Sequence, residues 1–222
     1  LMKINKKHLG LVTKKFNEFF FVDLKNKENF GNSERFLCKV RKSINFKDQF
    51  IYVGDEVEID NIDLTSKRAV IASLKKRQNL LNRPSVANIS NIYITFSVEE
   101  PKLNLSQVNR FLISAESMGV EVSLVLTKCD LISDKKQIFL LDKFKKWGYQ
   151  AIILNLYKSD HFEDLLAQLK KKKCSIFMGP SGVGKTTLLN KIIPGLQNST
   201  APVSNKIKRG KNTTRNVELF SI

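Results

Sequence analysis

Short runs of β-branched and aromatic residues, separated by polar stretches, fill the first third of the chain and predict an all-β domain. The runs lie at residues 19–24, 35–40, 49–53, 56–59 and 68–72. Runs of this length with alternating apolar and polar positions are typical of half-buried strands. Five short strands before residue 75 predict a small oligonucleotide-binding barrel, the OB-fold.

The pattern changes near residue 85, where strand candidates begin to alternate with helical ones. Apolar runs predict strands at 89–97, 120–126, 149–154 and 175–178. Apolar residues at helical spacing predict helices at 105–117, 135–147, 162–171 and 186–193. This alternation predicts a doubly wound, mostly parallel sheet. We therefore expect a multidomain protein, with an all-β domain over 1–78 and an α/β domain over 79–222.

A glycine-rich segment directly after the last predicted strand has the composition of a phosphate-binding loop. It comprises Gly179, Pro180, Ser181, Gly182, Val183, Gly184, Lys185, Thr186 and Thr187. Glycines let the backbone approach phosphate oxygens, and the N–H groups at the start of the next helix face the anion. Strand, loop and helix follow in the order that the motif requires. A chance glycine-rich turn explains this match less well.

Two side chains of the loop have the chemistry needed around a bound nucleotide. The Lys185 ammonium is expected to neutralise charge between the β- and γ-phosphates. The Thr186 hydroxyl is expected to bind Mg²⁺, which prefers oxygen ligands and shares its shell with phosphates. The loop therefore predicts a nucleotide bound together with Mg²⁺.

A second motif, after the predicted strand 120–126, indicates which base is bound. Thr127, Lys128, Cys129 and Asp130 differ at one position from Asn-Lys-x-Asp, the usual guanine-reading sequence. A carboxylate at Asp130 accepts from both the ring N–H and the exocyclic amine of guanine, a donor pair that adenine lacks. Alone, the four residues also fit a solvated turn. The end of a strand is where ligands bind in open α/β sheets, and together with the phosphate loop the motif favours GTP.

The base-reading motif precedes the phosphate loop, which reverses the usual order and is typical of a circularly permuted GTPase. Over nearly its whole length the chain resembles the ribosome small subunit-dependent GTPase A family of bacteria and organelles. The matching segments are Val-Gly-Asp-Glu-Val at 53–57, Asn-Arg-Pro at 82–84, Asn-Arg-Phe-Leu at 109–112, the loop and helix at 179–190, and Val-Glu-Leu-Phe at 217–220. The resemblance implies an OB-fold followed by a circularly permuted P-loop GTPase domain.

The resemblance also implies a function and partners. Members of that family are assembly factors that bind the small (30S) ribosomal subunit late in maturation and hydrolyse GTP when the subunit stimulates them. The implied partners are GTP or GDP, the small subunit and its rRNA. The implied roles are RNA or ribosome binding for 1–78 and GTP hydrolysis for 79–222. The protein is expected to be a monomer.

The region that aligns with the family's first switch departs from the family. Thr214 is expected to complete the Mg²⁺ shell once a γ-phosphate is bound. Asn212 stands where the family usually has a histidine implicated in hydrolysis. An amide orients water but takes no proton near neutral pH, which leaves the efficiency of turnover open. We take these two residues as the catalytic candidates.

The family's Asp-x-Pro-Gly motif and its C-terminal zinc-binding domain do not occur in this sequence. We therefore expect a longer parent GTPase, with zinc only in the part that this chain lacks. Cys38, Cys129 and Cys174 are widely spaced, without a metal-binding pattern, so no zinc site is expected here.

Composition agrees with a polyanionic partner. The chain has 38 Lys and Arg against 21 Asp and Glu, a net charge of +17, which attracts RNA in a salt-dependent manner. A lysine-rich genome bias or a need for solubility explains the same charge, so charge alone does not decide. The sequence shows no membrane-spanning run and no signal-peptide core, which predicts a cytoplasmic or stromal location without a membrane partner.

Two functional hypotheses stay open. The first is a GTPase whose nucleotide state controls binding to the small ribosomal subunit. The second is a guanine-nucleotide-dependent RNA-binding module without effective hydrolysis, which Asn212 favours. An RNA-linked ATPase ranks last, because it requires the guanine motif to be accidental.

Overall fold

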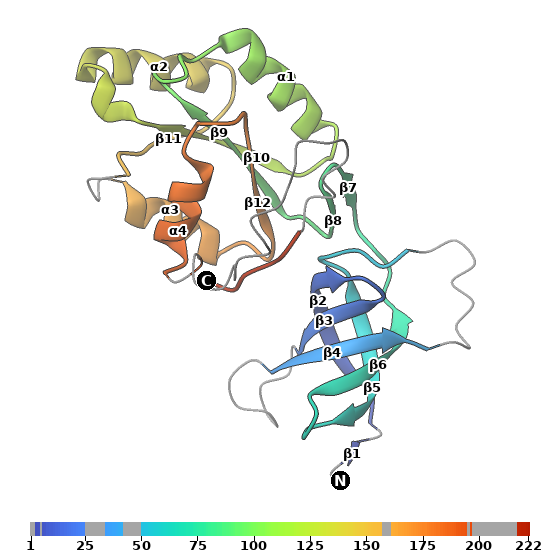
Figure 1. Ribbon diagram of the computed structural model, residues 1–222. Helices are drawn as coiled ribbons and strands as arrows, with labels where there is room; N and C mark the ends of the chain where they lie inside the picture. Colours follow the sequence, from blue (N-terminus) through green and yellow to red (C-terminus); the bar gives the residue numbers. More distant parts are fainter. Residues whose placement is uncertain are drawn as a thin grey trace, which may run out of the picture. The chain divides into compact units, whose positions relative to one another are not determined.

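The computed structural model describes residues 3–4, 6–24, 34–41, 50–156, 161–194, 196 and 217–222. These residues form two compact units (Figure 1). One unit contains the described residues up to Asn88 together with 217–221, and the other begins at Ile89.

The first unit is a closed five-stranded barrel, which confirms the predicted fold class. Its strands are β2 (His8–Phe16), β3 (Phe19–Leu24), β4 (Arg35–Val40), β5 (Glu56–Asp63) and β6 (Arg68–Leu74). The strands are paired in the order β5, β2, β3, β4, β6, and β6 pairs with β5 to close the barrel. A short β1 (Lys3–Ile4) extends the sheet beside the end of β5. β4 and β6 pair in parallel, and the other pairings between these five strands are antiparallel.

Alternation along the strands explains the barrel core. In β3, Phe20, Val22 and Leu24 are buried, while the residues between them are half-buried. Phe36 and Cys38 of β4 are fully buried, and burial raises the pKa of the Cys38 thiol to about 12, so the thiol stays neutral. The other core residues are Val12, Ile51, Val57, Ile59, Ile62, Ala69 and Ile71.

The sequence pattern misplaces one strand of the barrel. The strand predicted at 49–53 is wrong, because residues 50–53 form no strand and Val53 makes only an isolated bridge with Val86. Ile51 and Val53 are nevertheless buried, so the apolar run that suggested a strand reflects core packing by irregular backbone. The strand missing from the prediction is β2, whose end is basic and exposed.

A buried ion pair fixes the irregular segment before β5. The Asp55 side chain is inaccessible to solvent and accepts hydrogen bonds from Arg77 Nε (2.8 Å), Arg77 Nη2 (2.7 Å) and the Tyr52 backbone N–H (2.8 Å). The Arg77 guanidinium also lies 4.9 Å from the centre of the Tyr52 ring. These contacts tie the chain after β6 to the barrel. A hairpin of β7 (Leu80–Asn82) and β8 (Ser85–Ala87) follows.

The second unit contains a parallel four-stranded sheet, as predicted. The sheet order is β11 (Ala151–Ile153), β10 (Glu121–Thr127), β9 (Asn91–Ser97), β12 (Ser175–Met178). The helices are α1 (Leu105–Glu116), α2 (Asp134–Lys146), α3 (Phe162–Lys170) and α4 (Lys185–Ile192), with a short 3-10 helix, η1, at Cys129–Leu131. Every predicted helix and strand of this unit forms, with shifts of one to two residues at some ends.

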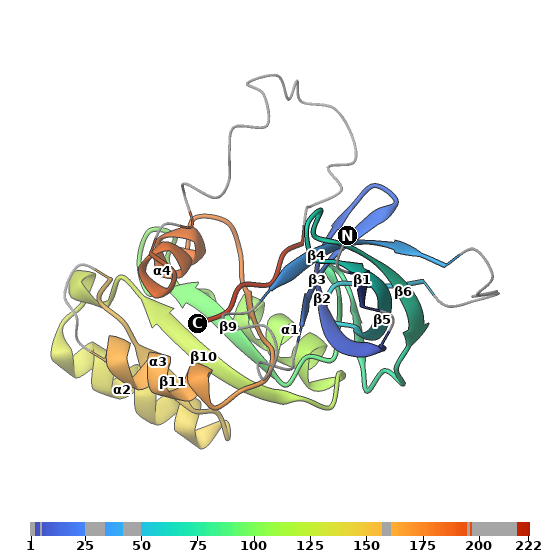
Figure 2. The ribbon, with the colours of Figure 1, turned by 90° about the horizontal axis from the view of Figure 1, so that it is seen from below.

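Helices cover both faces of this sheet (Figure 2). On one face, Tyr93 and Val125 pack with apolar residues of α3 and α4, such as Leu165 and Leu188. On the other face, Phe96 of β9 meets Phe111 of α1 edge to face. All seven residues of β9 are buried, and β9 lies between β10 and β12 in the sheet. Among the described helices, none has both the length and the apolar character needed to cross a membrane.

We expect Arg77→Met to lower the free energy of unfolding of the barrel unit by about 3–5 kcal/mol, because it leaves the Asp55 carboxylate buried without its cation. Urea denaturation followed by far-ultraviolet circular dichroism measures the change. Arg68→Met, at an exposed position, is the control. Equal unfolding midpoints for the two variants would contradict this role of the ion pair.

Candidate nucleotide-binding site

The predicted phosphate-binding loop connects the end of β12 to the start of α4. Gly179 follows the strand with φ +155°, and a Cβ there would lie 2.0 Å from the carbonyl oxygen of Thr95 in β9. Only glycine therefore lets the loop leave the sheet at this point. Gly184, with φ +90°, is the N-cap of α4, so the loop leads directly into the first turn of the helix. The N–H groups at the start of a helix are suited to bind an anion.

The side chain of Lys185 lies over the loop. Its ammonium donates to the carbonyl oxygen of Gly179 at 2.9 Å and to that of Pro180. These bonds hold the cation at the loop. A phosphate that enters the loop meets this positive charge without a large movement of the lysine stem.

The hydroxyl-bearing residues of the loop are exposed to solvent, and its valine is buried. Ser181, Thr186 and Thr187 are exposed, whereas Val183 is fully buried. Val183 therefore anchors the loop, and the Thr186 hydroxyl at the start of α4 is accessible to a hydrated metal ion. Oxygen donors of this kind suit Mg²⁺. Within the described ranges, no three His, Cys, Asp or Glu side chains gather into a metal site.

A hydroxyl joins the loop to the second motif. Thr127, the last residue of β10, is fully buried, and its Oγ1 donates to the Val183 carbonyl oxygen at 2.6 Å, with the Phe96 carbonyl oxygen at 3.3 Å. The structure thus joins two motifs through residues that are 56 positions apart in the sequence. Threonine replaces the usual asparagine here, yet it reaches the phosphate loop.

Asp130 lies on η1, directly after β10, and is exposed. Lys128 precedes it in the left-handed region, with φ 57°, and its ammonium donates to the Glu100 carbonyl oxygen. Cys129 is buried, and its thiol lies 3.3 Å from the Leu126 carbonyl oxygen. Burial raises the pKa of that thiol to about 12, so it is an anchor rather than a nucleophile. Asp130, next to this buried cysteine, is exposed.

The sequence analysis missed Gln137 of α2. Its Nε2 donates to the carbonyl oxygens of Cys129 (3.0 Å), the first residue of η1, and Ile132 (3.4 Å), which directly follows η1. The amide therefore braces the turn that carries Asp130. A lone glutamine on a polar helix face gives no sequence signal for this role.

The two catalytic candidates, Asn212 and Thr214, lie outside the described residues. Their roles stay predictions. The described part of the site therefore consists of the phosphate loop, the first turn of α4 and the motif after β10.

Comparisons with known proteins show the family of the chain. A family model described as RsgA GTPase matches residues 74–222. The small ribosomal subunit biogenesis GTPase RsgA of Prochlorococcus marinus (strain NATL1A) is 40% identical over 220 residues, which cover 96% of this chain and 70% of that protein. The protein of the same name from Synechococcus sp. (strain CC9605) is 40% identical over 192 residues, covering 86% and 63%.

Two solved structures have the same fold. YjeQ from Thermotoga maritima matches with a TM-score of 0.76 at 31% identity, and YloQ, described as a circularly permuted GTPase, with 0.72 at 25%. Each match covers 86% of this chain, and the chain spans 66% of the solved one. The permuted motif order inferred from the sequence is thereby confirmed.

We expect Thr127→Val to weaken GDP binding about 5- to 10-fold, because it removes the hydroxyl that holds the Val183 carbonyl while preserving side-chain volume. Titration with a fluorescent GDP analogue measures the affinity. Thr65→Val, the same change at an exposed position of the barrel unit, is the control. Unchanged affinity in the Thr127 variant would show that the loop keeps its shape without this bond.

Proposed function

The chain belongs to the RsgA GTPase family, and from this premise we propose that it binds GTP with Mg²⁺, hydrolyses GTP to GDP and phosphate, and assists late maturation of the small ribosomal subunit. The observation that carries the proposal is the bond from Thr127 to Val183, because it joins a complete phosphate loop to a guanine-reading motif. We further propose that the protein acts as a monomer in the cytosol or an organellar stroma.

The phosphate loop supports the triphosphate part of the proposal. The α4 N-terminus and the Lys185 ammonium supply positive charge where the β- and γ-phosphates would bind. The Thr186 hydroxyl, and Thr214 from the switch, are the proposed protein ligands of Mg²⁺. The ion would neutralise charge that develops on the phosphates during transfer.

The motif after β10 supports guanine as the base. In this proposal the Asp130 carboxylate accepts two hydrogen bonds from guanine, and the stem of Lys128 covers the base. Adenine offers neither donor in that arrangement. The exposure of Asp130 agrees with a residue whose partner is a ligand.

The barrel and the charge support ribosomal RNA as the partner. OB barrels bind oligonucleotides on the face of their second and third strands. A net charge of +17 attracts a polyanion strongly. The names of the relatives identify the small ribosomal subunit as the particle on which those proteins act. rRNA within that subunit is therefore the proposed polyanion.

A second candidate function is a guanine-nucleotide-dependent RNA-binding module without effective hydrolysis. Asn212 favours it, because this amide replaces the family histidine implicated in hydrolysis. In this alternative, nucleotide binding alone would control the affinity for RNA.

We expect Asp130→Asn to weaken GDP binding about 100-fold or more, because an NH2 donor replaces one of the two carboxylate oxygens that accept hydrogen bonds from guanine. The same variant is expected to gain affinity for xanthosine diphosphate, whose C2 carbonyl accepts from that amide. Calorimetry with both nucleotides measures this exchange, and Asp134→Asn on α2 is the control. Equal GDP binding by both variants would exclude the guanine assignment.

The activity itself is tested by GTP turnover with and without purified small ribosomal subunits. We expect stimulation by the subunits, and loss of turnover in Lys185→Ala through the loss of the phosphate-binding cation. GDP binding without turnover under either condition would favour the second candidate function.

We expect Asn212→His to raise the single-turnover rate with small subunits up to about 100-fold, because an imidazole accepts a proton near neutral pH. The rate should then fall at acid pH as the imidazole protonates. Asn205→His in the same segment is the control. An equal rate in both variants would mean that position 212 takes no part in proton transfer.

A further inference from the structure

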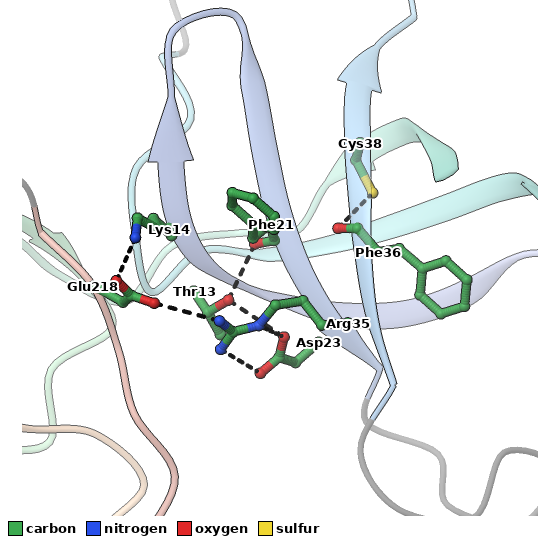
Figure 3. A network of polar contacts seen from close by, with 8 residues as sticks. All are labelled: Thr13, Lys14, Phe21, Asp23, Arg35, Phe36, Cys38 and Glu218. Carbon is green, nitrogen blue, oxygen red and sulfur yellow. Dashed lines mark hydrogen bonds and ion pairs between the residues drawn. The ribbon is translucent and has the colours of Figure 1, made fainter. Parts of the chain in front are cut away.

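Residues 217–221 lie beside the barrel and bring an acidic side chain between two of its cations. The Leu219 N–H donates to the Thr13 carbonyl oxygen at 2.8 Å. One carboxylate oxygen of Glu218 lies 2.6 Å from Lys14 Nζ, and the other lies 3.3 Å from Arg35 Nη1 (Figure 3). Glu218 therefore occupies an anion position between β2 and β4.

The barrel offers this docking place because β2 is irregular. Its register with β3 shifts between Val12 and Lys14, and its pairing with β5 extends only over residues 8–11. The Thr13 carbonyl is thus available to Leu219. Backbone pairing is confined to an isolated bridge between Lys14 and Glu218, so the ion pairs contribute a large part of the contact.

The two cations border the face of the barrel that is suited to RNA. Phe19 and Phe21 of β3 are half-buried, and the Lys39 ammonium of β4 lies 4.8 Å from the centre of the Phe19 ring. β3 and β4 are the second and third strands of the barrel, which form the oligonucleotide-binding face of OB-folds. Aromatic rings and cations side by side bind single-stranded RNA through stacking and phosphate contacts.

The carboxylate of Glu218 is a chemical substitute for a phosphate. Arginine and lysine bind both anions through charged hydrogen bonds. Asp23 already holds Arg35 in place, through Nε at 2.8 Å and Nη2 at 3.3 Å. The side chains of Lys14, Arg35 and Glu218 are 31%, 41% and 20% exposed, so a solvent-borne anion has access to the pair.

We propose that Lys14 and Arg35 form a phosphate-binding pair for RNA and that Glu218 occupies it in this conformation. RNA and the segment 217–220 then compete for the same two cations. Removing the Glu218 charge frees the pair, which raises RNA affinity. This inference rests on the RNA partner of the proposed function.

The test uses the full chain with Glu218→Gln and a fluorescent single-stranded oligouridine, titrated by anisotropy over a series of salt concentrations. We expect RNA binding to tighten about 2- to 10-fold, the range of two exposed ion pairs. The slope of log affinity against log salt should steepen by about 0.7 for each added phosphate contact. In Lys14→Gln/Glu218→Gln, most of the gain should be lost.

Glu58→Gln is the matched control, because Glu58 also bridges two lysines of the barrel unit, Lys7 and Lys75, and its loss changes the net charge equally. An equal gain in RNA affinity in this control would show that the effect comes from net charge alone, and it would overturn the proposal. Unchanged RNA affinity in Glu218→Gln would also overturn it. An equal gain for polyglutamate would show a general anion site and overturn the assignment to RNA.

The same preparations are titrated with GDP to separate the two proposals. If GDP binds normally and Glu218→Gln does not change RNA affinity, the phosphate-binding pair is overturned and the proposed nucleotide site is not. A gain in RNA affinity without GTP turnover in the presence of small ribosomal subunits leaves the pair intact and rejects hydrolysis. Absence of RNA binding in every variant overturns both the RNA partner and the pair.

Discussion

The bond from the Thr127 hydroxyl to the Val183 carbonyl is the interaction on which the nucleotide site depends. It is buried and joins the end of the base-reading strand to the phosphate loop, so neither motif can move far without the other. A buried carbonyl that lost this donor would stay unsatisfied, which makes the bond costly to break. One short side chain therefore links the proposed base-reading motif to the proposed phosphate-binding loop.

Chain order has no effect on this arrangement, because sheet order decides which loops meet. β9 lies between β10 and β12, and all three are parallel, so their carboxyl ends share one edge. The base-reading motif follows β10, and the phosphate loop follows β12. Ligands bind at this edge in open α/β sheets. A permuted chain thus builds the same site as long as the neighbours of β9 are kept.

The sequence predicted the helices and strands that depend on neighbouring residues. It missed the features that depend on contacts between residues far apart in the chain. The strand 175–178 was predicted with its observed ends, since an apolar run, a glycine loop and a helix follow one another. The strand at 49–53 was wrong because burial of Ile51 and Val53 mimics strand alternation. The roles of Thr127 and Gln137 depend on carbonyl groups that only folding brings near them. Spacing along the chain carries no record of such hydrogen bonds.

The phosphate loop is held by contacts with β9 and β10. The four residues of β12 are half-buried, and those of β9 are all buried. The fixed points of the loop agree with this: Gly179 touches the β9 backbone at Thr95, and Thr127 reaches Val183 from β10 beyond it. Contacts with β9 and β10 therefore hold the phosphate-binding loop in place. Substitutions in β9 that leave every loop residue intact should still alter how the loop meets a nucleotide.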